Sequence, residues 1–343
     1  MIWREFPTGS DGPVGSAGLR GAASRREMMP RPAQSIEEMF VKSTTGARPP
    51  AGLGAQAAVA YLLMGAVMIS FSGVWVKVAH VTPTVSAFYR VLFGGIILLV
   101  ICLARGEVRN PGARAVGRLI ICGLFFAVDL AFYHASIGYV GPGLGTILPN
   151  FQVFILAAVG ILFLKETVRP LFYVSVPLGM AGLFMIVGVG GTLDPTSARI
   201  GISFGLGAAA CYAVFLLFLR SMQAEGLGGS VFFLLTLVSL TTAVLLGAEI
   251  AVSGGSFRIP DLQTWLALLA LGLFSQSVGW LLITRALPGL RASLSGLVLL
   301  LQPSLAFVWD VLLFDRPTTA VNWLGVLITV SAIYAGALGR GKK

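Results

Sequence analysis

Charged residues are scarce in this sequence. Asp, Glu, Lys and Arg make up 11% of its 343 residues, whereas hydrophobic residues make up 56% and the mean hydropathy is +0.89. Soluble domains carry about 25% charged residues. The chain therefore lacks the charge that is needed to cover a water-facing surface, and a lipid bilayer is the expected solvent for most of it.

Residues and motifs of metal sites and catalysis are also scarce. Cys102, Cys122 and Cys211 each lie alone in an apolar run, and His80 and His134 are the two histidines. The motifs CxxC, HExxH and GxxxxGK[ST] do not occur. We therefore expect no metal site, no disulfide and no other cofactor. We also expect no enzymatic activity and no ATP-driven pumping by this chain.

The formal net charge of +10 does not indicate a nucleic acid as partner. Proteins that bind nucleic acids gather their basic residues on one soluble face. Here Lys and Arg lie mostly between apolar runs and near the two ends of the chain. Basic residues in such places set the orientation of membrane helices.

Hydropathy divides the chain into a tail and ten apolar stretches. Residues 1–54 are rich in Gly, Pro, Ala, Ser and Arg, which predicts a disordered basic cytoplasmic tail. Each later stretch is close to the ~20 residues with which a helix spans a bilayer. The predicted fold is an all-α polytopic membrane protein of ten transmembrane helices, at 55–79, 84–104, 117–139, 143–164, 170–190, 200–221, 229–250, 264–285, 292–314 and 320–338.

The distribution of Lys and Arg predicts the orientation. With the N-terminus in the cytoplasm, the outer loops carry Arg199, Arg258 and Arg316. The inner loops and the end of the chain then carry Arg105, Arg109, Arg114, Arg118, Lys165, Arg169, Arg220, Arg285, Arg291, Arg340, Lys342 and Lys343. Because positive residues favour the cytoplasmic side, we predict a multi-pass protein of a bacterial inner (plasma) membrane. Both termini, including the basic residues 339–343, are expected in the cytoplasm.

An internal repeat relates the two halves of the chain. The segment Ile161-Leu-Phe-Leu-Lys-Glu-Thr-Val168 resembles Val311-Leu-Leu-Phe-Asp-Arg-Pro-Thr318, and an apolar helix follows each. Pro142-Gly143 and Pro288-Gly289 precede them at matching places. Five spans is an odd number, so the second copy enters the membrane inverted. We expect two inverted five-helix repeats, 55–190 and 200–338, an architecture that is typical of secondary transporters.

Several segments of residues 55–338 resemble the EamA family of the drug/metabolite transporter superfamily. They are 70–77 (SFSGVWVK), 83–90 (PTVSAFYR), 157–166 and 301–317. The Gly-Glu pair that is usual in this family is replaced by Lys165-Glu166 in one half and Phe314-Asp315 in the other, and Pro149 lies about five residues before the position equivalent to Pro303. The resemblance implies transport but names no cargo, because relatives of one fold move unrelated metabolites.

Asp129 is the sharpest candidate for a functional residue, because polar side chains are costly at membrane depth. A lone carboxylate near the middle of the third span pairs with a cation or takes up a proton. Our interpretation is that Asp129, with His134 nearby, binds a cationic part of a solute or couples transport to protons. The alternative is a structural salt bridge, for which Arg90 and Lys77 are feasible partners.

Other polar and aromatic side chains in the spans are candidates for lining a solute cavity. The amides suit hydrogen bonding to a polar solute, and interhelical hydrogen bonds are their alternative role. The tryptophans suit stacking on cargo or plain core packing. These residues are Asn150, Gln152, Gln276, Gln302, Trp75 and Trp280. Asp310 is expected to be solvated or to cap a helix near the outer interface, and Glu166 is expected to cap the helix that follows it.

We predict a secondary transporter that exports a small polar metabolite, such as an amino acid or a related compound, by alternating access. A proton gradient or the gradient of the solute would drive it. The expected partners are the solute, protons and the lipid bilayer, and a homodimer stays open. The alternatives are a membrane-embedded enzyme that acts on lipid-linked substrates and a scaffold or receptor without transport activity.

Overall fold

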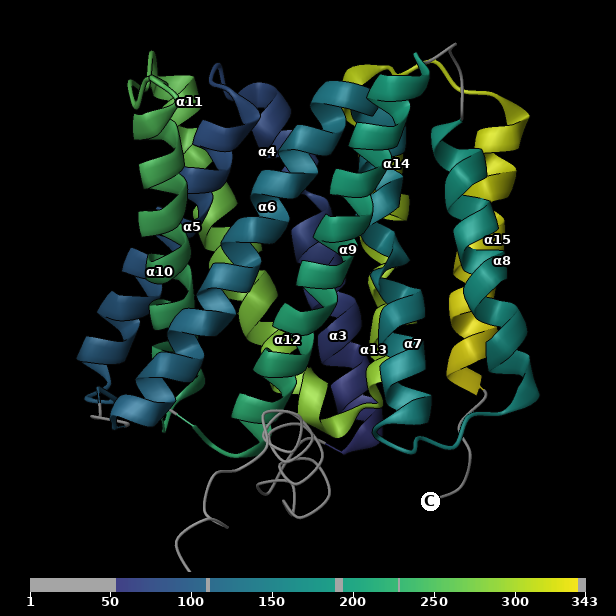
Figure 1. Cartoon of the computed structure of the whole chain (residues 1–343), viewed down its shortest axis with the longest axis horizontal. Helices are drawn as coiled ribbons and strands as arrows, with labels where there is room; N and C mark the ends of the chain where they lie inside the picture. The colour runs from purple at the N-terminus through teal and green to yellow at the C-terminus, as the bar shows by residue number, and fades with distance from the viewer. Residues whose placement is uncertain (1–53, 109–111, 189–193, 228, 339–343) are drawn as a thin grey trace, which may run out of the picture.

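The computed structural model describes residues 54–108, 112–188, 194–227 and 229–338. The predicted N-terminal tail up to residue 53 and the basic segment 339–343 lie outside these residues, as does Arg109. The described ranges form a bundle of helices (Figure 1).

The first half of the bundle corresponds to the first five predicted spans. The first span is α3 with α4, because the helix is interrupted at Phe71. The elements are α3 (Ala55–Ser70), α4 (Ser72–Val78), α5 (Pro83–Ala104), α6 (Ala113–Ile147), the 3₁₀ helix η2 (Leu148–Phe151), α7 (Gln152–Leu162) and α8 (Pro170–Val187).

The second half contains two further interrupted helices. A π-helix, η3, joins α11 to α12, and the helix breaks again at Leu300 between α13 and α14. The elements are α9 (Pro195–Ala224), α10 (Val231–Val252), α11 (Leu262–Ala270), η3 (Leu271–Gly279), α12 (Trp280–Ala286), the 3₁₀ helix η4 (Leu287–Gly289), α13 (Ala292–Leu299), α14 (Leu301–Phe314) and α15 (Ala320–Leu338).

Nine segments among the described residues are long and apolar enough to cross a membrane. One of them, Ala113–Leu162, has 50 residues, which at 1.5 Å per residue is about 75 Å of helix for a hydrocarbon core of about 30 Å. Its backbone leaves the helical conformation at Gly141 (φ 77°, ψ 166°). The chain rises along α6 and returns along α7 (Figure 1). The predicted count of ten requires this segment to cross the bilayer twice, and it stays a prediction.

The two halves run in opposite directions through the bundle. Ala55 begins α3 at the lower end of Figure 1, and Leu338 ends α15 at that same end. The first half therefore starts at the lower end and finishes at the upper end with Val187, whereas the second starts at the upper end with Pro195 and returns. This is the inverted arrangement that the sequence predicts.

The pairing of helices obeys the same inverted symmetry. Helices at equivalent places pack on each other, as in α5 with α10, α7 with α13 and α8 with α15. Two further pairs of contacts are swapped between the halves, because α6 packs on α9 as α3 packs on α12, and α5 packs on η3 as α10 packs on α6. The prediction of two inverted repeats is confirmed.

Glycines allow the closest of these approaches. A Cβ on Gly205 of α9 would collide with Leu148 and would lie 2.9 Å from Ser136 Oγ. A Cβ on Gly182 of α8 would lie 2.7 Å from the carbonyl oxygen of Gly325 on α15. Small residues at such positions let the helix backbones pack directly against each other, as membrane helices require in the absence of a hydrophobic drive between them.

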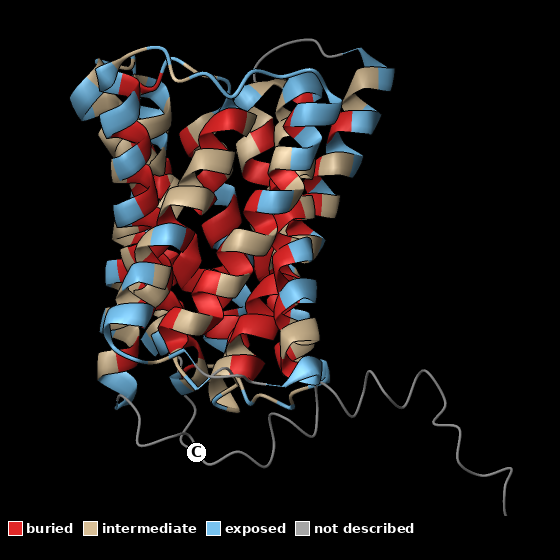
Figure 2. Cartoon of the chain, turned by 90° about the vertical axis from the view of Figure 1, so that its left-hand side faces the viewer, coloured by how far each residue is buried: buried red, intermediate tan, exposed pale blue. Residues whose placement is uncertain are grey.

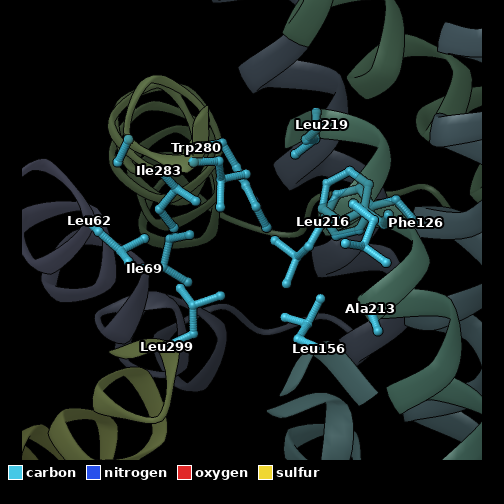
Figure 3. Close-up of a cluster of buried hydrophobic side chains, with 14 of the residues drawn as sticks. Leu62, Ile69, Phe126, Leu156, Ala213, Leu216, Leu219, Trp280, Ile283 and Leu299 are labelled. Carbon is cyan, nitrogen blue, oxygen red and sulfur yellow. The ribbon is translucent and has the colours of Figure 1, made fainter. Parts of the chain in front are cut away.

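A leucine-rich core closes the lower half of the bundle. Leu62, Leu156, Leu216, Ile283 and Leu299 come from five helices of both halves and are at most 2% exposed. Their side chains point toward a common centre (Figure 3). Buried residues continue through the middle of the bundle down to its lower end (Figure 2).

Candidate functional site

A cavity of about 420 Å³ lies between the two halves, above the leucine-rich core. Its wall reaches from Trp280 on α12 to Phe314 and Arg316 beyond the upper end of α14. The polar side chains on its wall are those of Ser70, Ser72, Arg90, Asp129, Tyr133, Thr146, Asn150, Tyr212, Gln302, Asp310 and Arg316. The cavity therefore extends from the middle of the bundle toward its upper end.

Two interrupted helices supply part of the wall at equivalent places. Pro149 and Asn150 lie in η2, and Gln302 and Pro303 directly follow the break at Leu300. Discontinuous helices at the interface of inverted repeats build the solute sites of many secondary transporters. The breaks thus lie at mid-depth together with polar side chains. In a continuous helix the backbone groups at this depth would be bonded within the helix.

The amides at the two breaks have unused hydrogen-bonding capacity. Asn150 Nδ2 donates to the carbonyl oxygen of Thr146 at 2.8 Å, and within the described chain its side-chain oxygen has no donor. Gln302 Nε2 is buried and has no partner with hydrogen-bond geometry among the described residues. Both side chains therefore have capacity for a further hydrogen bond at the cavity wall.

Asp129 and Arg90 place opposite charges on the cavity wall without forming an ion pair. Asp129 on α6 is 6% exposed, and no described residue donates a hydrogen bond to its carboxylate or lies within ion-pair distance of it. Arg90 on α5 acts on it electrostatically. The alternative of a structural salt bridge is not seen among the described residues, although both side chains line the same cavity. A buried charge without a partner is costly. The Asp129 carboxylate must therefore be hydrated, bind a cation or be protonated.

Lys77 pairs with Asp310 at the mouth of the cavity and not with Asp129. Lys77 Nζ lies 2.7 Å from Asp310 Oδ1 and 4.2 Å from the centre of the Phe314 ring. Arg316 Nη1 approaches the other carboxylate oxygen at 3.5 Å. Asp310, whose side chain is 28% exposed, is therefore flanked by two cations in addition to the solvent expected there.

Aromatic rings form the floor of the cavity above the leucine-rich core. Trp280 is 2% exposed, and its ring centre lies 4.9 Å from that of Phe215, 5.6 Å from Phe126 and 6.2 Å from Tyr212. Figure 3 shows Trp280 and Phe126 beside the leucines. The indole nitrogen of Trp280 has no acceptor among the described residues. The floor is therefore a cluster of edge-to-face aromatic rings that contains one indole donor without an acceptor among the described residues.

Two predicted site residues lie away from the cavity wall. His134 Nδ1 lies 3.4 Å from Thr84 Oγ1 on α5, so the side chain links α6 to α5. The ring of Trp75 on α4 stacks against that of Phe274 on η3 at 6.3 Å, and Trp75 also packs on a small cluster of buried residues around α11. The structure thus does not bring His134 or Trp75 together with Asp129.

Two of the four predicted amides also lie behind the wall. Gln152 Nε2 donates to the carbonyl oxygen of Gly296 at 3.3 Å in the contact of α7 with α13. Gln276 bonds the side chain of Arg90. By contrast, Tyr212 was not predicted, although its hydroxyl approaches Gln302 in the cavity. A phenol inside an apolar run is the signal that could have identified it.

Glu166 caps α13 of the other half and not α8, the next helix along the chain. Its carboxylate accepts hydrogen bonds from the backbone N–H of Ala292 at 2.7 Å, from that of Ser293 at 3.2 Å and from Ser293 Oγ at 2.7 Å. Arg220 on α9 lies 3.6 Å away. This prediction was wrong because the start of α13 is close in space although distant in the sequence.

Backbone conformation also corrects the alignment of the two repeats. Lys165 (φ 52°) and Asp315 (φ 50°) are the non-glycine residues with positive φ among those described. Both residues occupy the position of the glycine in the Gly-Glu pair that the sequence comparison used. Lys165-Glu166 is therefore equivalent to Asp315-Arg316 and not to Phe314-Asp315. An acid caps α13 at the lower end, whereas the equivalent position at the upper end carries Arg316 beside the open cavity.

A model of the EamA-like transporter family matches residues 56–188 and 199–335 of this chain. An "Uncharacterized transporter" of Clostridium kluyveri is 24% identical over 250 residues, which cover 70% of this chain and 78% of that protein. The "Uncharacterized transporter YvbV" of Bacillus subtilis is 22% identical over 264 residues, which cover 74% and 82%. One crystal structure superposes with a TM-score of 0.71 at 17% identity, over 84% of this chain and all of that one.

Proposed function

Because the chain belongs to the EamA-like transporter family, we propose that it is a secondary transporter which exports a small zwitterionic metabolite, such as an amino acid, by alternating access. The protein is a multi-pass membrane transporter of a small-molecule solute. The proposal adds the class of solute, the direction and the mechanism.

The proposed class of solute rests on one observation. The cavity wall contains the carboxylate of Asp129 and the guanidinium of Arg90 on different helices, and the two do not form an ion pair. Asp129 suits an ammonium group, and Arg90 suits a carboxylate. Asn150, Gln302 and the indole N–H of Trp280 add neutral hydrogen-bonding groups. A zwitterion satisfies both charges at once, whereas a simple amine or acid leaves one buried charge without a partner.

The closed lower half supports alternating access. The cavity reaches the upper end, but the leucine-rich core separates it from the lower end. The latch formed by Glu166, Arg220 and the start of α13 joins the halves there. Inverted repeats supply the opposite state when the two halves exchange conformations. We propose that Asp129 takes up a proton when the solute leaves, which avoids an uncompensated charge.

The basic residues support the proposed orientation. Arg105, Arg118, Lys165, Arg220 and Arg285 lie at the lower end, where α5, α7 and α9 finish. Following the bias of basic residues toward the cytoplasm, we propose that the lower end faces the cytoplasm of a bacterial cell, with both termini on that side. The cavity then opens to the outside in this conformation, from which an exporter releases its solute.

Transport by the purified protein in proteoliposomes tests the proposal. We expect exchange of at least one standard amino acid across the membrane. We also expect Asp129→Asn to abolish exchange or its pH dependence while the protein still folds. Loading radiolabelled solute inside or outside the vesicles, with an imposed pH gradient, tests direction. The absence of flux for every standard amino acid, or an unchanged pH-dependent flux in Asp129→Asn, would contradict the proposal.

A further inference from the structure

Arg90 is held from behind by a buried amide. Its Nε donates to Gln276 Oε1 at 3.1 Å, and its two terminal nitrogens form no hydrogen bond with any described residue. A guanidinium binds a carboxylate through two parallel N–H groups. With Nε occupied, the fork made by the two terminal nitrogens is the one that remains for a carboxylate in the cavity.

Gln276 itself has one available orientation. The residue is 2% exposed, and its Nε2 donates to Ser239 Oγ on α10 at 3.0 Å. The amide oxygen therefore faces the arginine and the amide nitrogen faces the serine. A Cβ on Gly94 of α5 would lie 2.5 Å from Gln276 Cβ, so a larger residue at this position of α5 would displace the glutamine.

The backbone around Gln276 is a π-helix. This kind of helix is rare in proteins, and where it occurs it is often part of a functional site. Ser277, the next residue of η3, donates to the carbonyl oxygen of Gly94 at 3.2 Å and so fixes the π-helix to α5. Trp280 on the cavity floor follows η3 directly. The same segment of the second half thus holds the arginine of the first half and supplies the floor.

We infer that Gln276 is a positioning residue, which with Ser239 fixes the plane of the Arg90 guanidinium so that its terminal fork faces the carboxylate group of the solute. Gln276 touches no solute itself. The inference rests on the proposed function, because it gives the arginine of that same cavity the role of carboxylate receptor. Its consequence is specific: losing the amide weakens binding of a carboxylate-bearing solute but not of the corresponding amine.

Binding measurements with a matched pair of ligands test this. The first ligand is the standard amino acid that most raises the melting temperature of the wild-type protein, and the second is the amine that its decarboxylation gives. We expect Gln276→Leu to weaken amino acid binding about tenfold, which corresponds to one charge-assisted hydrogen bond. Binding of the amine should change by less than about twofold, because the amine makes no bond with the fork.

Two serines provide the controls. Ser239→Ala should lower the amino acid to amine affinity ratio in the same direction, and Ser239→Thr, which keeps the hydroxyl, should restore it. This pair carries the test if Gln276→Leu does not fold. Ser275→Ala changes a buried serine of the same π-helix that bonds the carbonyl oxygen of Met68 at 3.4 Å and not Arg90. It should leave the ratio unchanged.

Arg90→Gln separates the two proposals. If Arg90→Gln removes the preference for the amino acid while Gln276→Leu and Ser239→Ala keep it, the positioning role is refuted and the proposed site stands. If Arg90→Gln also keeps the preference, or no amino acid raises the melting temperature, the proposed site fails and the positioning role fails with it. Equal weakening of amino acid and amine by Gln276→Leu would indicate a purely structural glutamine and would also refute the inference.

Discussion

The Glu166 latch at the lower end makes a quantitative prediction for Glu166→Gln. The side chain of Glu166 is 7% exposed and that of its partner Arg220 is 17% exposed. The carboxylate accepts two backbone and one hydroxyl hydrogen bond at the start of α13. The substitution keeps the size of the side chain but removes its charge and replaces one of its two acceptor oxygens by an NH2 donor, so it weakens both the ion pair and the hydrogen bonds of the latch.

The expected loss follows from these contacts. Hydrogen bonds to a charged acceptor contribute about 1.5–3 kcal/mol each, against about 0.5–1.5 kcal/mol for neutral ones. The anion at a helix N-terminus adds about 0.3–1 kcal/mol. Arg220 keeps its bond to the carbonyl oxygen of Leu290 at 3.1 Å, which limits the cost of leaving its charge unpaired. We expect the free energy of unfolding to fall by roughly 2–4 kcal/mol.

Reversible unfolding in mixed micelles, followed by circular dichroism, measures this loss. Glu107→Gln is the matched control, because Glu107 also lies at the lower end and bonds Arg105 and Ser230, but the Arg105 and Glu107 side chains are 57% and 26% exposed. Glu107→Gln should lower the free energy of unfolding much less than Glu166→Gln does, since solvent screens exposed ion pairs. Equal losses for the two variants, or a loss below about 1 kcal/mol for Glu166→Gln, would refute the account of the latch.

Three further predictions concern the upper end and the packing of the halves. The hydrogen bonds from His80 and from the backbone of Thr264 lower the pKa of Asp261 to about 2, whereas the value in the unfolded chain is near 3.9. The stability that this group contributes is therefore complete above about pH 4 and is lost as the pH falls toward about 2. Asp261→Asn should remove this loss of stability in acid when melting temperatures are compared across pH. Gly205→Val should lower the free energy of unfolding by about 1–3 kcal/mol or prevent folding, because its Cβ overlaps η2. Asp310→Asn should change stability by about 1 kcal/mol or less, because its lysine partner is half-exposed, and a larger loss in the same assay would contradict the description of an open mouth.

The membrane fold was predictable because lipid imposes a length and a polarity on every span. The predicted spans 84–104 and 320–338 coincide almost fully with α5 and α15. The inverted repeat was visible because an odd number of spans reverses the second copy. The interruptions at η2, η3 and Leu300 were not predicted, because hydropathy does not give the local backbone conformation, which tertiary packing decides.

The cavity was predictable in part, because a polar side chain at membrane depth needs water or a partner. Asp129, Arg90, Asn150, Gln302 and Trp280 were identified in this way, and all of them line the cavity. Whether they bind a solute stays a prediction until it is measured.

The errors concern partners that are distant in the sequence. Lys77 bonds Asp310, which lies 233 residues further along the chain, and Glu166 bonds Ala292, which lies 126 residues further. Hydropathy gives the depth of each residue but not the direction in which its helix face points. Gln276 was predicted at the wall for that reason, although it lies behind Arg90.

Cysteine accessibility from the two sides of the membrane tests alternating access most directly. In a background without Cys102, Cys122 and Cys211, single cysteines would replace Ala306 on the cavity wall and Leu299 in the leucine-rich core. The account predicts that a transported solute slows labelling at 306 from the upper side and speeds labelling at 299 from the lower side. Labelling of 299 that stays absent under every condition in which flux occurs would contradict it.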